Sequence, residues 1–217
     1  EQYMLHRVYD LNENFKNYFK SYDFHNLYKE LLNFCTVDLS AFYFDIRKDA
    51  LYCDSKDSER RKSCIVVLNV ILESLIKWFA PILSFTTEEI CMLVSKDSKS
   101  IHLEKFMVFP KLFENEQLDK KWIELKKIRD ICNISIEEKR ASKEIGSSLE
   151  ASLIINLNKN LFALVKNIDM AELCITSSVE ITQTTNDETT AKTKKAEGEK
   201  CPICWKINKN GCKRHLS

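Results

Sequence analysis

Glycine and proline, the residues that make most tight turns, are almost absent from this chain. The 217 residues include only three glycines and three prolines. A sandwich or barrel of many short strands needs a turn after every strand, so this composition favours a few long helices. Hydrophobic residues make up 44% of the chain and charged residues 30%, which is the balance of a globular protein with a buried core. The predicted fold class is therefore mainly α.

Apolar residues recur at spacings of three and four along several stretches, which predicts amphipathic helices. One stretch runs from Met4 to Phe19, another from Leu118 to Ile136, and the most apolar one from Cys64 to Leu83. Polar residues interrupt the last stretch, so we expect a core helix rather than a membrane span. A further seam is formed by Tyr28, Leu32, Cys35, Leu39, Phe42 and Ile46. Together these helices predict an antiparallel bundle over residues 1–144.

Beyond the bundle, strand-like and helix-like segments alternate. Residues 152–157 and 172–182 resemble strands, and residues 161–167 resemble a short helix. We therefore predict a small α/β junction unit over residues 145–182. Residues 183–200 are rich in Thr, Lys, Asp and Glu and poor in large apolar side chains, so we expect a linker or an exposed hairpin there.

The C-terminal segment, residues 201–217, carries two pairs of residues that commonly bind metals. Cys201 and Cys204 form a C-x2-C pair, and Cys212 and His215 form a C-x2-H pair. Two such pairs can place four donors tetrahedrally around one Zn²⁺, which leaves no coordination position open for a substrate. We predict a zinc knuckle with a structural ion.

Two alternatives to a metal site stay open for these cysteines. The thiols could be incidental in a frayed tail, although two correctly spaced pairs rarely coincide in so short a segment. A redox-active C-x-x-C is the other rival, but the βαβ context that such a motif needs is missing around it. Gly211, directly before the second pair, permits the sharp turn that the knuckle requires.

The remaining six cysteines indicate the compartment. They are scattered through apolar or helical segments, where a thiol behaves as a small hydrophobe. The chain also opens on an amphipathic helix without the features of an export signal. A reducing cytoplasm is therefore the expected location.

Basic residues gather near the predicted knuckle. From Ala191 to Ser217 there are eight Lys or Arg against two glutamates, and Trp205 follows the first ligand pair. Such a surface can hold phosphates by charge and stack an unpaired base on the indole, although Trp205 could instead pack over the zinc site as a lid.

We assign no catalytic residue. The predicted RNA contacts are Arg60, Arg61, Lys139, Arg140, Lys143, Trp205, Lys206, Lys213 and Arg214. Further candidates are Lys126, Lys127 and Arg129, of which the first two are better explained as solvated charges on a helix.

Four stretches and the terminal finger share their pattern with one known family. The stretches are YDFH at Tyr22–His25, NFCTVDLSAFYFDI at Asn33–Ile46, APILSFTTEEI at Ala80–Ile90 and IGSSLEA at Ile145–Ala151. They resemble the region that follows the catalytic domain in bacterial isoleucyl-tRNA synthetases, and the resemblance extends from the first helix to the last ligand. Two departures are Cys91, where the family often has Trp, and His215, where Cys is usual. The spacer between the two ligand pairs is also shorter.

The resemblance implies a helical anticodon-binding domain and a parent enzyme that uses ATP to charge tRNA(Ile) with isoleucine. The sequence has neither the H-x-G-H nor the K-M-S-K-S signature that holds ATP. We therefore expect a fragment that recognises tRNA(Ile) as a monomer, with ATP and isoleucine bound in a catalytic domain that it lacks, and with no DNA or membrane partner. The alternative is a freestanding helical module with a structural zinc knuckle that binds another protein.

Overall fold

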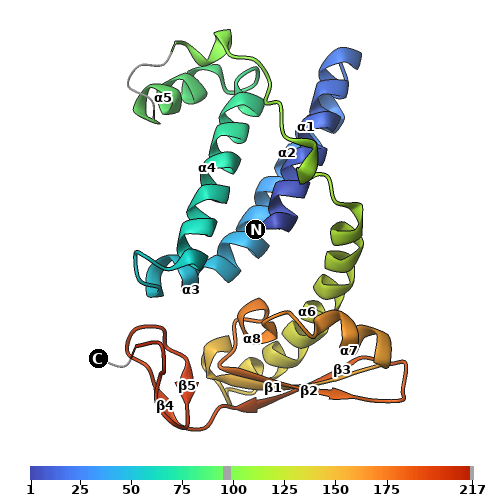
Figure 1. The fold of residues 1–217 in the computed structure, drawn as a ribbon, viewed down its shortest axis with the longest axis vertical. Coiled ribbons are helices and arrows are strands. Elements are labelled where there is room, and N and C mark those ends of the chain that lie inside the picture. Colours follow the sequence, from blue (N-terminus) through green and yellow to red (C-terminus); the bar gives the residue numbers. More distant parts are fainter. Residues whose placement is uncertain (95–98, 216–217) are drawn as a thin grey trace. The chain divides into compact units, whose positions relative to one another are not determined.

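The structure is a computed structural model that describes residues 1–94 and 99–215. Its contacts divide the chain into two compact units, Glu1–Glu116 and Gln117–Ser217. The first unit is helical, and the second contains a small mixed sheet with helices on one face (Figure 1). The predicted class, mainly α with a small α/β unit and a terminal Cys/His knuckle, is confirmed. Within the described ranges, no helix is both long and apolar enough to cross a membrane.

Aromatic packing forms the centre of the first unit. The buried indole of Trp78 meets the rings of Phe15 and Phe34 edge to face, with ring centroids 4.9 and 6.0 Å away. These arrangements are the favoured ones for aromatic pairs. The elements of this unit are α1 (Gln2–Ser21), α2 (Phe24–Asn33), the π-helix η1 (Phe34–Phe44), α3 (Asp45–Cys53), α4 (Glu59–Phe79), α5 (Ser84–Val94) and the 3-10 turns η2 (Ile101–Leu103) and η3 (Lys111–Phe113).

The seam predicted for the second helix is wrong in its first half. Tyr28 and Leu32 are exposed, whereas their neighbours Leu27 and Leu31 are fully buried. The prediction assumed one unbroken α-helix, but α2 continues into η1, where hydrogen bonds span five residues and the turn is wider. The wider turn rotates the buried face by about one residue. The later seam positions Leu39, Phe42 and Ile46 are buried as predicted.

Buried polar side chains hold a crossing segment, residues 104–115, against α1. The Trp78 indole N–H donates to the side-chain oxygen of Asn12 (3.2 Å), and the Asn12 amide donates to the carbonyl oxygen of Met107 (2.9 Å). At the end of the segment, the backbone N–H of Asn115 donates to Nδ1 of the buried His6 (3.1 Å). Asn12 is fully buried, so its hydrogen bonds to Trp78 and Met107 replace water that cannot reach it.

The second unit is built on a three-stranded sheet of order β2-β1-β3. β1 pairs in parallel with β2 and antiparallel with β3, and a separate pair, β4 and β5, forms the base of the terminal knuckle. The buried side chains of β1 alternate with half-buried ones along the strand. The elements are α6 (Glu116–Ala141), η4 (Ser148–Glu150), β1 (Ala151–Leu157), α7 (Lys159–Val165), α8 (Met170–Leu173), β2 (Ser178–Gln183), β3 (Thr190–Lys195), β4 (Glu199–Lys200) and β5 (Ile207–Asn208).

Two expectations are corrected in this unit. The sequence pattern assigned α6 to the bundle, but nearly all of it belongs to the compact unit of the sheet, where the Ser135 hydroxyl lies 2.8 Å from that of Thr193 on β3. Residues 183–200 were expected to be a linker or hairpin, yet they contain β3, which pairs with β1 along its whole length. Thr193, the buried residue of β3, is polar, so the strand lacks the hydrophobic alternation that would reveal it.

The predicted segment limits, 1–144, 145–182, 183–200 and 201–217, therefore differ from the compact units of the structure, which meet between residues 116 and 117. The units follow spatial contacts, whereas the predicted limits follow changes in sequence pattern. Residues 216 and 217 lie outside the described residues. As boundaries between functional segments, the predicted limits stay a prediction.

We expect Asn12→Ala to destabilise the first unit. The variant removes the partner of the buried indole N–H of Trp78 and of the carbonyl of the half-buried Met107, which costs about 2–3 kcal/mol. Asn17→Ala, an exposed position on the same helix, is the matched control and should change the free energy of unfolding by less than about 0.5 kcal/mol. Urea unfolding followed by circular dichroism measures both. Equal effects of the two substitutions would show that the buried amide does not hold the crossing segment.

Candidate metal centre

Two short, hydrogen-bonded turns carry the predicted metal ligands. In the first, the N–H of Cys201 donates to the carbonyl of Lys206 (2.9 Å), and the N–H of Trp205 donates to the carbonyl of Cys201 (3.0 Å). In the second, the N–H of His215 donates to the carbonyl of Cys212 (3.1 Å). Each closed turn keeps the two ligand residues of its pair close together.

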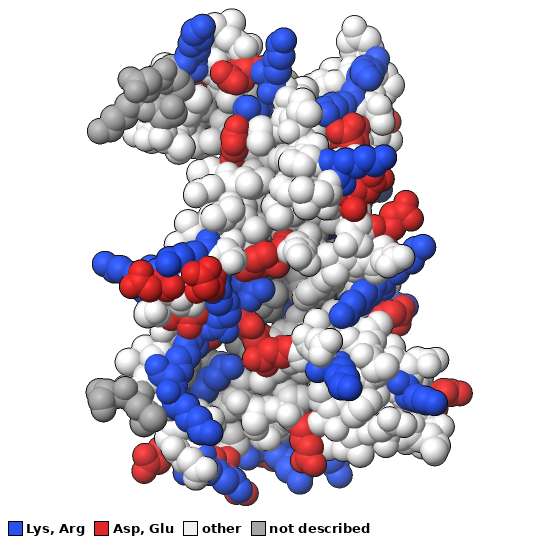
Figure 2. All heavy atoms as spheres, in the orientation of Figure 1, with Lys and Arg blue, Asp and Glu red and all other residues white. Residues whose placement is uncertain are grey.

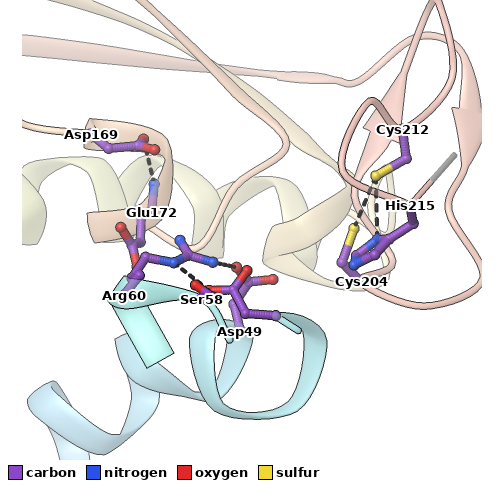
Figure 3. Close-up of polar contacts among 9 residues, drawn as sticks. Asp49, Ser58, Arg60, Asp169, Glu172, Cys204, Cys212 and His215 are labelled. Atoms are coloured by element: carbon purple, nitrogen blue, oxygen red, sulfur yellow. Dashed lines mark hydrogen bonds and ion pairs between the residues drawn. The ribbon is translucent and has the colours of Figure 1, made fainter. Parts of the chain in front are cut away.

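The structure brings all four predicted ligand residues into one cluster. The donor atoms of Cys201, Cys204, Cys212 and His215 lie within 4.8 Å of one another. The sulfurs of Cys204 and Cys212 are 3.8 Å apart, and Nδ1 of His215 lies 3.4 Å from the sulfurs of Cys201 and Cys212. Figure 3 shows Cys204, Cys212 and His215 pointing toward one another. Over the described residues, this is the one group of His, Cys, Asp or Glu with a geometry that could hold a metal ion.

The spacing of these atoms fits a tetrahedral ion. Zinc binds sulfur at about 2.3 Å and imidazole nitrogen at about 2.0 Å, so a tetrahedron places two sulfurs about 3.8 Å apart and a sulfur and a nitrogen about 3.5 Å apart. The observed distances are close to both values. Three thiols and one imidazole also form a donor set that suits zinc far better than magnesium or calcium. The cluster could therefore hold a metal ion.

The two cysteines of the first turn lie in opposite electrostatic environments. Backbone N–H groups, that of Cys204 first and that of Ile203 second, point at the sulfur of Cys201 and lower the pKa of its thiol to about 6. Burial raises the pKa of the Cys204 thiol to about 12. Cys201 is therefore a thiolate at neutral pH, whereas Cys204 needs a bound cation to favour its deprotonation.

Three residues in or directly before the knuckle have positive φ angles. Trp205, directly after the first pair, has φ 61°, which only glycine adopts without strain, and its side chain is 60% exposed. Gly211 has φ 73°, as the predicted sharp turn requires. Gly198 was not singled out from the sequence, yet it has φ 124°, and a Cβ there would lie 2.4 Å from the carbonyl group of Asn208. Glycine is required where β4 passes so close to β5.

The knuckle, residues 201–215 with β4, is attached to the sheet through one buried hydroxyl. The backbone N–H of Ile207 donates to Oγ of Ser177 (2.6 Å), and the Ser177 hydroxyl donates to the carbonyl of Leu149. The ammonium group of Lys200 lies 3.5 Å from the carboxylate of Glu150. Knuckle and sheet are therefore connected by specific contacts rather than by a loose linker.

The IGSSLEA stretch supplies the sheet side of this attachment. The N–H of Gly146 donates to the carboxylate of Glu150 (2.9 Å) and holds the pKa of that carboxyl below its usual range. The carbonyl of Glu150 accepts the N–H of Ala196, where the chain leaves β3 for the knuckle (2.8 Å). This loop positions the knuckle, a role that the sequence pattern did not reveal.

Arg60, a predicted RNA contact, is engaged within the first unit. Its guanidinium donates to the carboxylates of Asp54 (2.7 Å) and Asp49 (3.0 Å), which connects the start of α4 to α3 (Figure 3). Ser58 donates to the same Asp54 carboxylate (3.3 Å). Arg61 is half-buried, and its Nε has no acceptor among the described residues. Contact of either arginine with RNA stays a prediction.

The three predicted RNA contacts at the end of α6 differ in how strongly they are paired. Lys139 binds the carboxylate of Glu144 (2.8 Å) and lowers the pKa of that carboxyl, and Arg140 binds Glu137 (2.6 Å). Lys143 has no ion pair within the described part of the chain, and with Arg140 it lines an open hollow of about 490 Å³. Lys143 is therefore the most available cation of this group.

The basic residues of the knuckle are mostly exposed. Lys213 and Arg214 are exposed and Lys206 is half-buried, and Figure 2 shows basic side chains gathered over the β4–β5 knuckle. Of the further candidates on α6, Lys127 pairs with Glu124 (2.7 Å). Arg129 donates to the carbonyl of Leu173 (2.9 Å) and so connects α6 to α8. The knuckle thus presents the predicted cations to solvent, whereas Arg129 is used by the fold.

Comparison with known proteins covers the whole chain. Residues 1–155 match the family model of the anticodon-binding domain of tRNA ligase. The chain is 77% identical over 215 residues to a protein named isoleucine–tRNA ligase from Pelagibacter ubique (strain HTCC1062), covering 99% of the chain and 24% of that protein. A protein of the same name from Bartonella quintana (strain Toulouse) is 41% identical over 184 residues, covering 84% of the chain and 19% of that protein. Another from Agrobacterium fabrum (strain C58 / ATCC 33970) is 36% identical over 221 residues, covering 95% of the chain and 22% of that protein. The chain spans about a quarter of the length of these relatives or less.

We expect Cys204→Ser to abolish tight metal binding without loss of helicity, because the cluster loses one of its four donors while the helical core is untouched. Cys91→Ser, which changes a half-buried cysteine of α5 outside the cluster, is the control and should retain the metal. Metal content after gel filtration and far-UV circular dichroism measure the two effects. A global loss of helicity in Cys204→Ser alone would contradict a locally folded knuckle.

Proposed function

The chain belongs to the anticodon-binding domain family of tRNA ligases, and on this basis we propose that it is the tRNA-recognition part of an isoleucine–tRNA ligase. The observation that carries the proposal is the 77% identity to a protein of that name, which extends through bundle, sheet and knuckle. The whole enzyme would join isoleucine to tRNA(Ile) using ATP. Because the ATP-binding signatures are absent from this sequence, ATP and isoleucine would bind in a part of such an enzyme outside it.

In this proposal the Cys/His cluster holds one structural Zn²⁺. The donor set and the donor spacing support zinc, and four protein ligands leave no position for a reacting group. The bound ion holds the two turns of the knuckle together. The residues around it then keep the basic side chains and Trp205 in place for contact with RNA.

Trp205 is the proposed stacking platform for an unpaired base. The exposed indole lies beside the ammonium group of Lys200, 5.9 Å from the ring centroid. A base on the ring would therefore lie near a cation that can reach its phosphate. A lid over the metal would be buried, so the 60% exposure of the indole favours stacking.

The remaining basic residues would bind the phosphate backbone near the anticodon. Lys143, Lys213 and Arg214 are exposed. We further propose that the chain acts as a monomer in the cytoplasm. Its nine cysteines, all among the described residues, form no disulfide, which supports a reducing compartment.

We expect the chain to bind tRNA(Ile) more tightly than a non-cognate tRNA at matched salt, with a preference that weakens when a chelator removes the metal. Filter binding or fluorescence anisotropy over a range of salt concentrations measures both affinities. Equal and weak binding to the two tRNAs would argue against this function and favour the alternative, a helical module that binds another protein.

We expect Trp205→Gly to weaken tRNA binding while leaving metal retention unchanged or improved. Glycine accepts φ 61° without strain, but removal of the ring abolishes stacking, which is worth about 1–3 kcal/mol per base. Trp205→Phe is the matched variant, which keeps an aromatic face and should retain most of the affinity. Loss of metal in Trp205→Gly, without a direct effect on tRNA binding by the metal-loaded protein, would identify the indole as a structural lid.

A further inference from the structure

One face of the three-stranded sheet is bare. The helices of the second unit lie on the other face (Figure 1). That covered face contains the buried Leu153 and Ile155 of β1, and Thr193 of β3 reaches α6 through its hydroxyl contact with Ser135. Side chains alternate between the two faces of a strand, so the neighbours of these residues project from the bare face.

Hydrogen-bonding groups cover much of the bare face. At one end, Ser178 on β2 donates to the hydroxyl of Ser152 on β1 (2.8 Å). At the other end, the Asn156 amide of β1 donates to the hydroxyl of Thr190 on β3 (3.0 Å). The face contains no aromatic residue at any of its positions. It therefore offers hydroxyl and amide groups but no platform on which a base could stack.

Two lysines project from the same face. Lys192 and Lys194 flank the buried Thr193, are exposed, and lie about 7 Å apart along the strand. Lys194 is directly opposite Ser152 in the register, so an ammonium group and hydroxyls share one end of the face. Neither lysine has an ion pair within the described ranges of the chain. The acidic residue of the face, Glu180, lies two strands away on β2.

We propose that this bare face binds the sugar–phosphate backbone of RNA, with Lys192 and Lys194 on neighbouring phosphates and the Ser152–Ser178 pair on phosphate or ribose oxygens. Lysine and hydroxyl groups are the usual partners of the backbone, whereas base reading needs the stacking groups that are missing here. β3 leads directly into the knuckle, so the face adds to the basic surface there. The inference rests on the proposed function, because it takes tRNA as the RNA.

The test is tRNA binding by the full chain carrying Lys192→Gln and Lys194→Gln together. Each phosphate contact contributes about 0.7–0.9 to the slope of log affinity against log salt, so the slope should fall by about 1–2 and low-salt affinity should weaken about three- to tenfold. The loss should be equal for tRNA(Ile) and a non-cognate tRNA, because backbone contacts carry no sequence information. Glu180→Gln should strengthen binding to both tRNAs, since it removes a charge that repels phosphate.

The matched control is Lys159→Gln with Lys166→Gln, which removes two exposed lysines from the same unit at and beside α7, away from the bare face. An equal loss of slope in the control would show that only the overall charge matters for binding. An unchanged slope in the test variant would show that Lys192 and Lys194 do not bind phosphate and instead protect the edge strand β3 from aggregation. Both outcomes overturn the inference. Failure of the proposed function is different, because it appears in the unaltered chain as a lack of preference for tRNA(Ile).

Discussion

The knuckle is too small to bury a core of its own, so its shape depends on attachments at its two ends. At one end, four side chains meet within metal-binding distance. At the other, the hydroxyl of Ser177 accepts from Ile207 and donates to Leu149. A serine can do both because one oxygen is donor and acceptor at once, and no apolar residue can replace it. The exposed groups around the Cys/His cluster therefore have fixed positions relative to the sheet.

The helical unit uses polar groups in a similar way within an apolar interior. Helices packed by hydrophobic contact alone tolerate small shifts along one another, whereas a buried hydrogen bond has one geometry. Asn12 fixes Trp78 of α4 and Met107 of the crossing segment with a single side chain. His6 accepts from Asn115 through Nδ1, so its proton lies on Nε2, which faces the carboxylate of Asp10 at 3.2 Å. These contacts specify where the crossing segment lies on α1.

The features that depend on local sequence were predictable, and those that depend on distant partners were not. The apolar spacing of α1 and the two ligand pairs are local, since each turn brings its own pair together. The shifted face around Tyr28 depends on the π-helix that follows it, and β3 is held by backbone pairing with β1 without hydrophobic alternation. Ser177 meets the knuckle only after the sheet has formed. Surface charge was ambiguous for the same reason, because Arg60 binds the carboxylate of Asp49 on the adjoining helix α3.

The strand order β2-β1-β3 also determines an order of assembly. β1 and β2 are joined by the short helices α7 and α8, so they can pair once residue 183 has left the ribosome. The other edge of β1 stays open until β3 follows, and pairings between segments distant in sequence are the slower ones to form. A chain interrupted before residue 195 would expose an unpaired strand edge, which is a template for association with other chains. Synthesis of the residues from β3 onward thus adds the third strand to the sheet and also supplies the knuckle.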